Sequence, residues 1–145
     1  MEEKAERAML TGASAAKRLA DACEPPAEGA PSLRLDTVRG LALDLGRHLA
    51  GLAAEDPNPS LLAEAAQKCA DLATLAACNA DEIDYSDAAE AIRLAAEATE
   101  SLRRAVETRV PSDEEAKDGR SDLVRRDARS ASWKASLAAR QMGVS

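Results

Sequence analysis

Apolar residues recur along most of this chain at alternating steps of three and four, which is the spacing of one face of an α-helix. The clearest apolar stripe lies in residues 86–109 and consists of Ala88, Ile92, Ala95, Thr99, Leu102 and Val106. Glutamate and arginine residues occupy the other faces of the same segment. The pattern predicts five helices, at residues 2–23, 32–54, 60–79, 86–109 and 113–142.

Proline, glycine and short polar residues separate the stripes and predict where the helices begin and end. The longest connection, at residues 24–31, contains three prolines and a glycine. The expected caps are short polar residues, with Ser60, Ser86 or Asp87, and Ser112 starting helices and Asn79 ending one in a left-handed conformation. Because the connections are short, the helices should pack antiparallel in a single domain covering residues 1–145.

Alanine supplies 34 of the 145 residues, phenylalanine is absent, and Trp133 and Tyr85 are the only aromatic residues. This composition lacks strand formers and favours an all-α bundle with an alanine-rich core. An alanine core buries little apolar area per residue but allows close helix packing, so Gly40, Gly46 and Gly51 are expected at close contacts. Small-residue faces on several helices predict a homo-oligomer, most simply a dimer, with Trp133 as a candidate interface anchor.

The formal net charge of −7 argues against nucleic-acid binding, because phosphate recognition requires a basic surface. Every apolar run is far shorter than the roughly 20 residues that span a bilayer, so no membrane segment is expected. The acidic beginning Met1-Glu2-Glu3 lacks the basic region of a signal peptide, which predicts a cytoplasmic protein.

The three cysteines are widely spaced and the chain has one histidine, so the sequence predicts neither a metal site nor a disulfide framework. Cys23, Cys69 and Cys78 are expected as buried thiols in the core.

His48 lies beside the apolar face of the second helix and is a candidate acid or base. Because no carboxylate partner lies next to it in the sequence, a structural role is the simpler interpretation.

Charge is distributed unevenly in the second half of the chain. Carboxylates gather around the start of the fourth helix, where they suit the positive end of the helix dipole. The alternative is that Asp84 or Asp87 points into a cleft and transfers protons. The last helix is locally basic, with Arg125 and Arg129 one turn apart on the same side. Ion pairing with the acidic remainder is the simpler interpretation of this helix, and an anionic-ligand site is the alternative.

A proline-led helix runs from Pro59 to Asn79, and after a short link Ser86-Asp87 opens an alanine-rich helix. A Ser-Asp-Glu turn follows at residues 112–114, and a Ser-Ala-Ala segment at residues 14–16 lies in the first helix. In this order the features resemble the formiminotransferase-cyclodeaminase C-terminal family, which includes the methenyltetrahydrofolate cyclohydrolases. The chain would be a shortened relative, and Met9-Leu10-Thr11-Gly12 stands where the family has a lead rich in proline and glycine.

The resemblance implies a helical homo-oligomer that deaminates formimino-tetrahydrofolate or hydrolyses the methenyl form, with tetrahydrofolate bound. In this alternative the candidate residues are Asp87 and His48 for acid–base chemistry and Ser86, Arg93, Arg125 and Arg129 for ligand binding. The preferred interpretation is a non-catalytic, self-associating bundle without a cofactor. The glycine-rich lead is replaced, and the carboxylates near the fourth helix would repel an anionic ligand. The sequence leaves open whether the protein is an enzyme.

Overall fold

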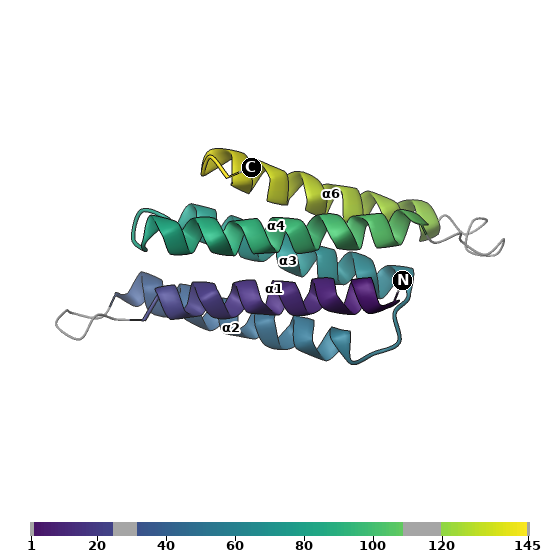
Figure 1. Ribbon diagram of the computed structural model, residues 1–145, viewed down its shortest axis with the longest axis horizontal. Helices are drawn as coiled ribbons and strands as arrows, with labels where there is room; N and C mark the ends of the chain where they lie inside the picture. The colour runs from purple at the N-terminus through teal and green to yellow at the C-terminus, as the bar shows by residue number, and fades with distance from the viewer. Residues whose placement is uncertain (1, 25–31, 109–119, 145) are drawn as a thin grey trace.

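The computed structural model describes residues 2–24, 32–108 and 120–144, and all regular secondary structure in these ranges is helical (Figure 1). The helices are α1 Glu2–Ala22, α2 Leu33–Ala53, α3 Pro59–Cys78, α4 Tyr85–Thr108 and α6 Arg120–Gln141. The predicted all-α class is confirmed, and the first four helices agree with the predicted ranges to within one residue at each end. The predicted start of the last helix at residue 113 and its cap Ser112 lie outside the described residues.

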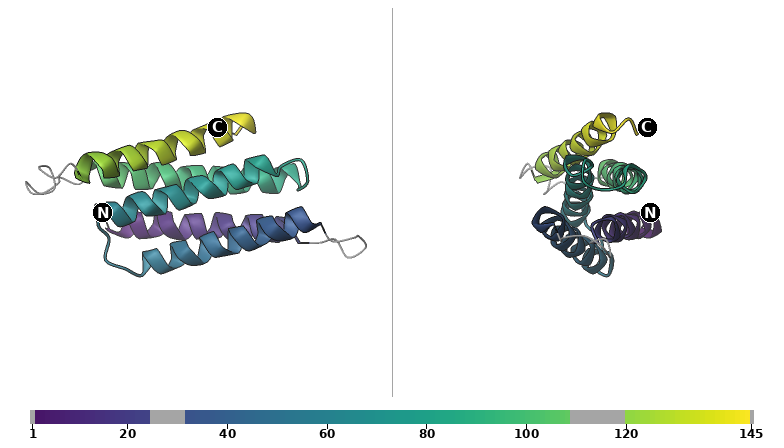
Figure 2. Two further views of the ribbon diagram at one scale, coloured as in Figure 1. Left: turned by 180° about the vertical axis from the view of Figure 1, so that it is seen from behind. Right: turned by 90° about the vertical axis from the view of Figure 1, so that its left-hand side faces the viewer.

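Successive helices run antiparallel, and together they form three layers. α3 and α4 form the middle layer, α1 and α2 lie on one side of it, and α6 lies on the other (Figures 1 and 2). α1 packs mainly against α2 and α4, whereas α2 meets α3 along a narrower contact. Within the described residues α6 touches only α3 and α4. One face of α6 is therefore not covered by any described helix.

Alanine and leucine fill the interfaces between the layers. The largest side chains with almost no exposure are Met9, Leu19, Leu49, Leu62, Leu72, Ile92 and Leu102. Between them the helices meet through alanines such as Ala16, Ala66 and Ala95, which are at most 1% exposed. Because alanine projects a single methyl group, the helix axes come close together and the core is sensitive to small changes in volume.

Gly12 sits at a close contact between α1, α2 and α3. A Cβ atom at this position would lie 2.5 Å from Cys69 Sγ and 3.0 Å from Leu49 Cδ1. Real Cβ atoms do not approach other atoms so closely, so any side chain at Gly12 would force its neighbours to move. Glycine is therefore required here by space, and not by backbone conformation.

The three glycines of α2 were all expected at close contacts, and only one of them is. A Cβ atom at Gly46 would lie 3.0 Å from the Cβ of Ala16. The prediction is wrong for Gly40 and Gly51, which have nothing within 4 Å. Both lie on the exposed face of α2, where no other helix approaches them within the described residues.

The start of α3 differs from the predicted one. Asn58 Oδ1 accepts the backbone N–H of Leu61 at 2.9 Å, and Pro59 occupies the first helical position. Proline is favoured at that position because its missing N–H would have no partner inside the helix. The predicted cap Ser60 is therefore wrong, and Asn58 caps the helix instead.

The end of α3 is held by side-chain contacts. Asn79 has a φ of −117°, so the predicted left-handed conformation is wrong. Its side-chain amide donates to Leu75 O at 2.8 Å, and its Oδ1 accepts from Arg34 Nε at 2.7 Å. Arg34 also donates to Asp81 and to the carbonyl of Cys78. These bonds join the start of α2 to the end of α3.

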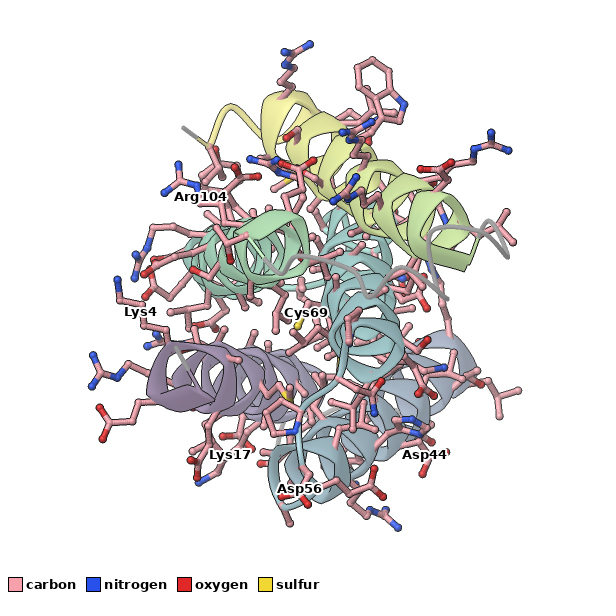
Figure 3. All side chains as sticks on the ribbon, turned by 90° about the vertical axis from the view of Figure 1, so that its right-hand side faces the viewer. Lys4, Lys17, Asp44, Asp56, Cys69 and Arg104 are labelled. Atoms are coloured by element: carbon pink, nitrogen blue, oxygen red, sulfur yellow. The ribbon has the colours of Figure 1, made fainter. Side chains whose placement is uncertain are left out.

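The cysteines occupy two kinds of environment. Cys23 and Cys69 are buried, as predicted, but the prediction is wrong for Cys78, which is exposed in the last turn of α3. Figure 3 shows Cys69 in the interior of the bundle. Burial raises the pKa of the Cys69 thiol to about 12, so this side chain stays protonated at neutral pH.

Candidate functional site

The start of α4 contains Ser86 and Asp87, two of the predicted site residues. Asp84 Oδ1 accepts the backbone N–H of Ser86 at 2.9 Å and that of Asp87 at 3.3 Å. Asp84 is therefore the cap, and the predicted cap at Ser86 or Asp87 is wrong. The backbone N–H groups of these two candidate site residues are therefore already bonded to a carboxylate.

Arg93 lies on the solvent side of α4 among glutamates. Its guanidinium donates to Glu90 at 2.5 Å and to Glu97 at 3.4 Å. Arg18 from α1 lies 3.5 Å from the same Glu90 carboxylate. The hydrogen bond from Arg93 is the main reason why the pKa of Glu90 is below its ordinary value. Arg93 thus belongs to an ion-pair cluster between α4 and α1.

His48 pairs with a carboxylate from the neighbouring helix. Its Nε2 lies 3.0 Å from Glu64 Oε1 on α3, and both side chains are nearly half exposed. The partner is 16 residues away in the sequence, so a search for a carboxylate next to His48 could not find it. An exposed pair of this kind is a contact between α2 and α3.

Arg129 takes part in a polar cluster along the contact between α4 and α6. Its Nε donates to Glu107 at 2.8 Å, and Glu107 also accepts from Arg103 at 2.6 Å. Glu100 pairs with Arg103 and accepts the hydroxyl of Ser132 at 2.8 Å. The hydrogen bond from Arg103, more than that from Ser132, lowers the pKa of Glu100 to about 2. Ion pairing with Glu107 therefore accounts for Arg129, and Arg103 is the basic residue at the centre of this cluster.

The predicted acid–base and ligand-binding residues do not come together. Ser86 lies in the first turn of α4, whereas Arg129 pairs with Glu107 near the last turn. At about 1.5 Å per residue these two places are roughly 30 Å apart along the helix. α6 runs antiparallel to α4, so Arg125 lies farther still from Ser86. His48 belongs to a separate contact.

The outer face of α6 exposes three large apolar residues, which we call the α6 stripe. Leu123, Trp133 and Leu137 are 57%, 62% and 43% exposed. Trp133 precedes Leu137 by one helical turn, and Leu123 lies two heptads before Leu137, so all three share one side of the helix. Trp133 was expected as an interface anchor. Leu123 and Leu137 were not predicted as interface residues, although their helical spacing from Trp133 could have indicated it.

A groove of about 670 Å³ separates α1 from α4. Buried alanines form its floor, namely Ala8, Ala98 and Ala105. Three exposed cations line its rim, Lys4 and Arg7 from α1 and Arg104 from α4. Figure 3 shows Lys4 and Arg104 on the same side of the molecule, on the two opposing helices. No sequence pattern indicates this groove, because its cations come from helices that are neighbours only in space.

Metal ligands and membrane spans were also expected to be absent. In the described ranges no group of three histidine, cysteine, aspartate or glutamate side chains is placed to hold a metal ion. No helix in the same ranges is both long and apolar enough to cross a bilayer. The expected cytoplasmic location stays a prediction.

No protein-family model, curated protein or solved structure matches this chain. The resemblance to the formiminotransferase-cyclodeaminase C-terminal family therefore stays a prediction based on the motifs.

Proposed function

We propose that this protein is a non-catalytic helical bundle that self-associates through the α6 stripe, with the α6 helices of two copies packed antiparallel. The observation that carries the proposal is the 62% exposure of Trp133 on a helix face that no described helix covers. Large aromatic side chains are frequent anchors of protein interfaces. Packing the stripe against a second copy removes its apolar area from water.

The spacing of residues on α6 fits an antiparallel pair. Two sets recur every seven residues, Leu123, Ser130 and Leu137 in one and Arg126, Trp133 and Arg140 in the other. Placing Trp133 opposite Ser130 of the second copy gives the indole ring room above a small side chain. The same register lays the aliphatic stem of Arg126 on Leu137 of the second copy.

This register also brings opposite charges together. Asp127 and Lys134 lie on the same edge of the stripe, seven residues apart. In an antiparallel helix pair, such positions on the two copies face each other. Each copy then contributes one carboxylate and one ammonium to two equivalent ion pairs. Pairs of this kind select the register of an interface more than they strengthen it.

The folate-dependent alternative needs an acid or base and several cations around one ligand. Asp87 lies at the start of α4, while Arg129 pairs near the other end of that helix. Arg93 is already paired with two glutamates. No observation therefore favours this alternative, and the proposal includes neither a cofactor nor a catalytic role for Asp87 or His48.

Sedimentation equilibrium tests the proposal. The wild-type mass should rise with concentration from 15.2 kDa towards twice that value. Trp133→Ala should weaken the association by at least about tenfold, because it removes the central anchor. Leu33→Ala is the matched control, since it removes an 86% exposed leucine from outside the stripe and should leave the association unchanged.

Charge exchange tests the register. Lys134→Asp should weaken the association, because two carboxylates would then face each other. Adding Asp127→Lys to the same chain should restore it, because the ion pairs are re-formed with their partners exchanged.

A wild-type mass that stays at 15.2 kDa at all concentrations contradicts self-association. A dimer indifferent to Trp133→Ala contradicts the α6 stripe as its interface.

A further inference from the structure

The groove between α1 and α4 concentrates positive charge in an otherwise acidic protein. Lys4, Arg7 and Arg104 line it, and Glu97 is the one carboxylate among its described lining residues. Glu97 is itself 3.4 Å from Arg93, which offsets its charge. In the part of the chain that the structure describes, the side chains of Lys4 and Arg7 form neither an ion pair nor a hydrogen bond, whereas Arg104 Nε lies 3.4 Å from Glu100 Oε1.

The same groove has an apolar floor. Ala8, Ala98 and Ala105 are at most 8% exposed and present only methyl groups to the space above them. Ser101 lies midway along the groove and adds a hydroxyl group. The volume of about 670 Å³ is within the range of small-molecule sites, which are mostly apolar with a few polar groups that fix orientation.

We propose that this groove binds a small amphipathic anion. The apolar body of the ligand lies on the alanine floor, and its sulfonate, phosphate or carboxylate group meets Arg7, Arg104 and Lys4. Guanidinium groups bind such oxyanions through paired, charge-assisted hydrogen bonds. The two arginines come from opposing helices, so a single anionic group can be held between them. The site shares no residue with the α6 stripe and does not depend on self-association.

Anilinonaphthalene sulfonate is a suitable probe, because it joins a sulfonate to an apolar body and fluoresces strongly where water is excluded. Its fluorescence should rise to saturation as the wild-type protein is added. Phenylnaphthylamine, which has the same apolar body without the sulfonate, should bind at least about tenfold more weakly. Added salt should weaken binding of the sulfonate, because the cations are exposed to solvent.

Variants locate the bound probe. Arg7→Gln combined with Arg104→Gln should weaken sulfonate binding by about tenfold or more. Arg47→Gln is a control for lost charge, since it removes an exposed arginine of α2. Ser101→Phe fills the groove without removing a charge and should abolish binding. Trp133→Ala should retain it, which separates the groove from the α6 stripe.

Circular dichroism verifies that each variant is still helical. Equal affinity for the neutral and the anionic probe overturns the proposal, and this comparison uses the wild-type protein only. Sulfonate binding that survives Ser101→Phe also overturns it. Binding lost in Trp133→Ala but kept in Ser101→Phe would place the probe on the α6 stripe and overturn the groove as its site.

Discussion

Two contacts in this bundle hold helices together by different physical means. Around Gly12, the side chains of Cys69 and Leu49 occupy the space that a side chain would fill, and all three residues are uncharged and buried. Between α4 and α6, the polar cluster around Glu100 and Arg103 lies at the edge of a contact in which the described buried residues of α6 are alanines. Its side chains are partly exposed, Arg103 at 23% and Glu100 at 37%.

The difference predicts two kinds of sensitivity. A close-packed apolar contact responds to the volume of a methyl group, because the surrounding helices relax only partly. Partly exposed ion pairs contribute about 1 kcal/mol or less each, and salt or acid weakens them. Stability should therefore depend on volume at the Gly12 contact and on pH at the polar cluster.

The largest effect is expected at Leu49, which is fully buried beside Gly12. Leu49→Ala should lower the free energy of unfolding by about 2–5 kcal/mol, because it removes buried apolar area and leaves a cavity. Urea denaturation followed by circular dichroism measures the change. Leu41→Ala, a 49% exposed leucine on the same helix, is the control and should stay within about 0.5 kcal/mol of the wild type. Similar losses in the two variants would contradict the volume argument.

A smaller loss is expected at Gly12. Gly12→Ala should lower the free energy of unfolding by about 1–3 kcal/mol, because the new Cβ would lie 2.5 Å from Cys69 Sγ. The same substitution at Gly40, which has nothing within 4 Å, should instead raise it by about 0.5–1 kcal/mol through better helix propensity. Urea denaturation should thus give opposite signs for the two glycines.

A double variant sharpens this prediction. Cys69→Ala removes the sulfur atom that conflicts with the new methyl group, so Gly12→Ala should cost less in that background than in the wild type. Urea midpoints with and without Gly12→Ala are measured in the wild type and in Cys69→Ala, and the shift is compared between the two backgrounds. If the two costs are the same, the contact with Cys69 does not limit the side chain at position 12.

The smallest effect is expected at Glu100. Arg103 lowers the pKa of Glu100 from 4.5 to about 2 in the folded protein. The stability that this carboxylate contributes is therefore fully present above about pH 4.5 and is lost as the pH falls through about 2. Glu100→Gln should lower the free energy of unfolding by no more than about 1 kcal/mol at neutral pH, because the pair is partly exposed. That difference should vanish near the folded-state pKa.

The measurement is urea denaturation of wild type and variant at neutral pH and again near pH 2, where the carboxylate titrates. Gly12→Ala is the matched control, because its cost arises from packing and should be the same at both pH values. A pH-independent difference for Glu100→Gln would mean that its charge does not stabilise the contact between α4 and α6.

The helices could be predicted because the three-and-four spacing runs through each of them. The spacing tells which face of a helix is buried, but it does not tell which helix that face meets. The three-and-four spacing puts Gly12 on the same face of the first helix as Met9 and Ala16, yet nothing in the sequence places Cys69 opposite it. The pair of His48 with Glu64 was missed for the same reason.

The candidate site could not be assembled from local patterns. Asp84, Ser86 and Asp87 are all good caps by residue type, and only the three-dimensional geometry selects Asp84. The resemblance groups Arg125 and Arg129 with Ser86 in one ligand site. The structure does not bring these residues together, for a different reason. An antiparallel connection puts the first half of α6 beside the last turns of α4, so the predicted topology already argued against it.

The two classes of cysteine make the opening of this bundle measurable on a single chain. Cys78 is exposed in the native fold, whereas Cys69 is buried and its thiol stays protonated. An alkylating reagent attacks the thiolate, so Cys78 reacts from the native state and Cys69 reacts only after α3 separates from α1. The ratio of the two labelling rates then gives the equilibrium constant for opening under native conditions. Alkylation of Cys69 thus reports how often the contact between Gly12 of α1 and Cys69 of α3 opens.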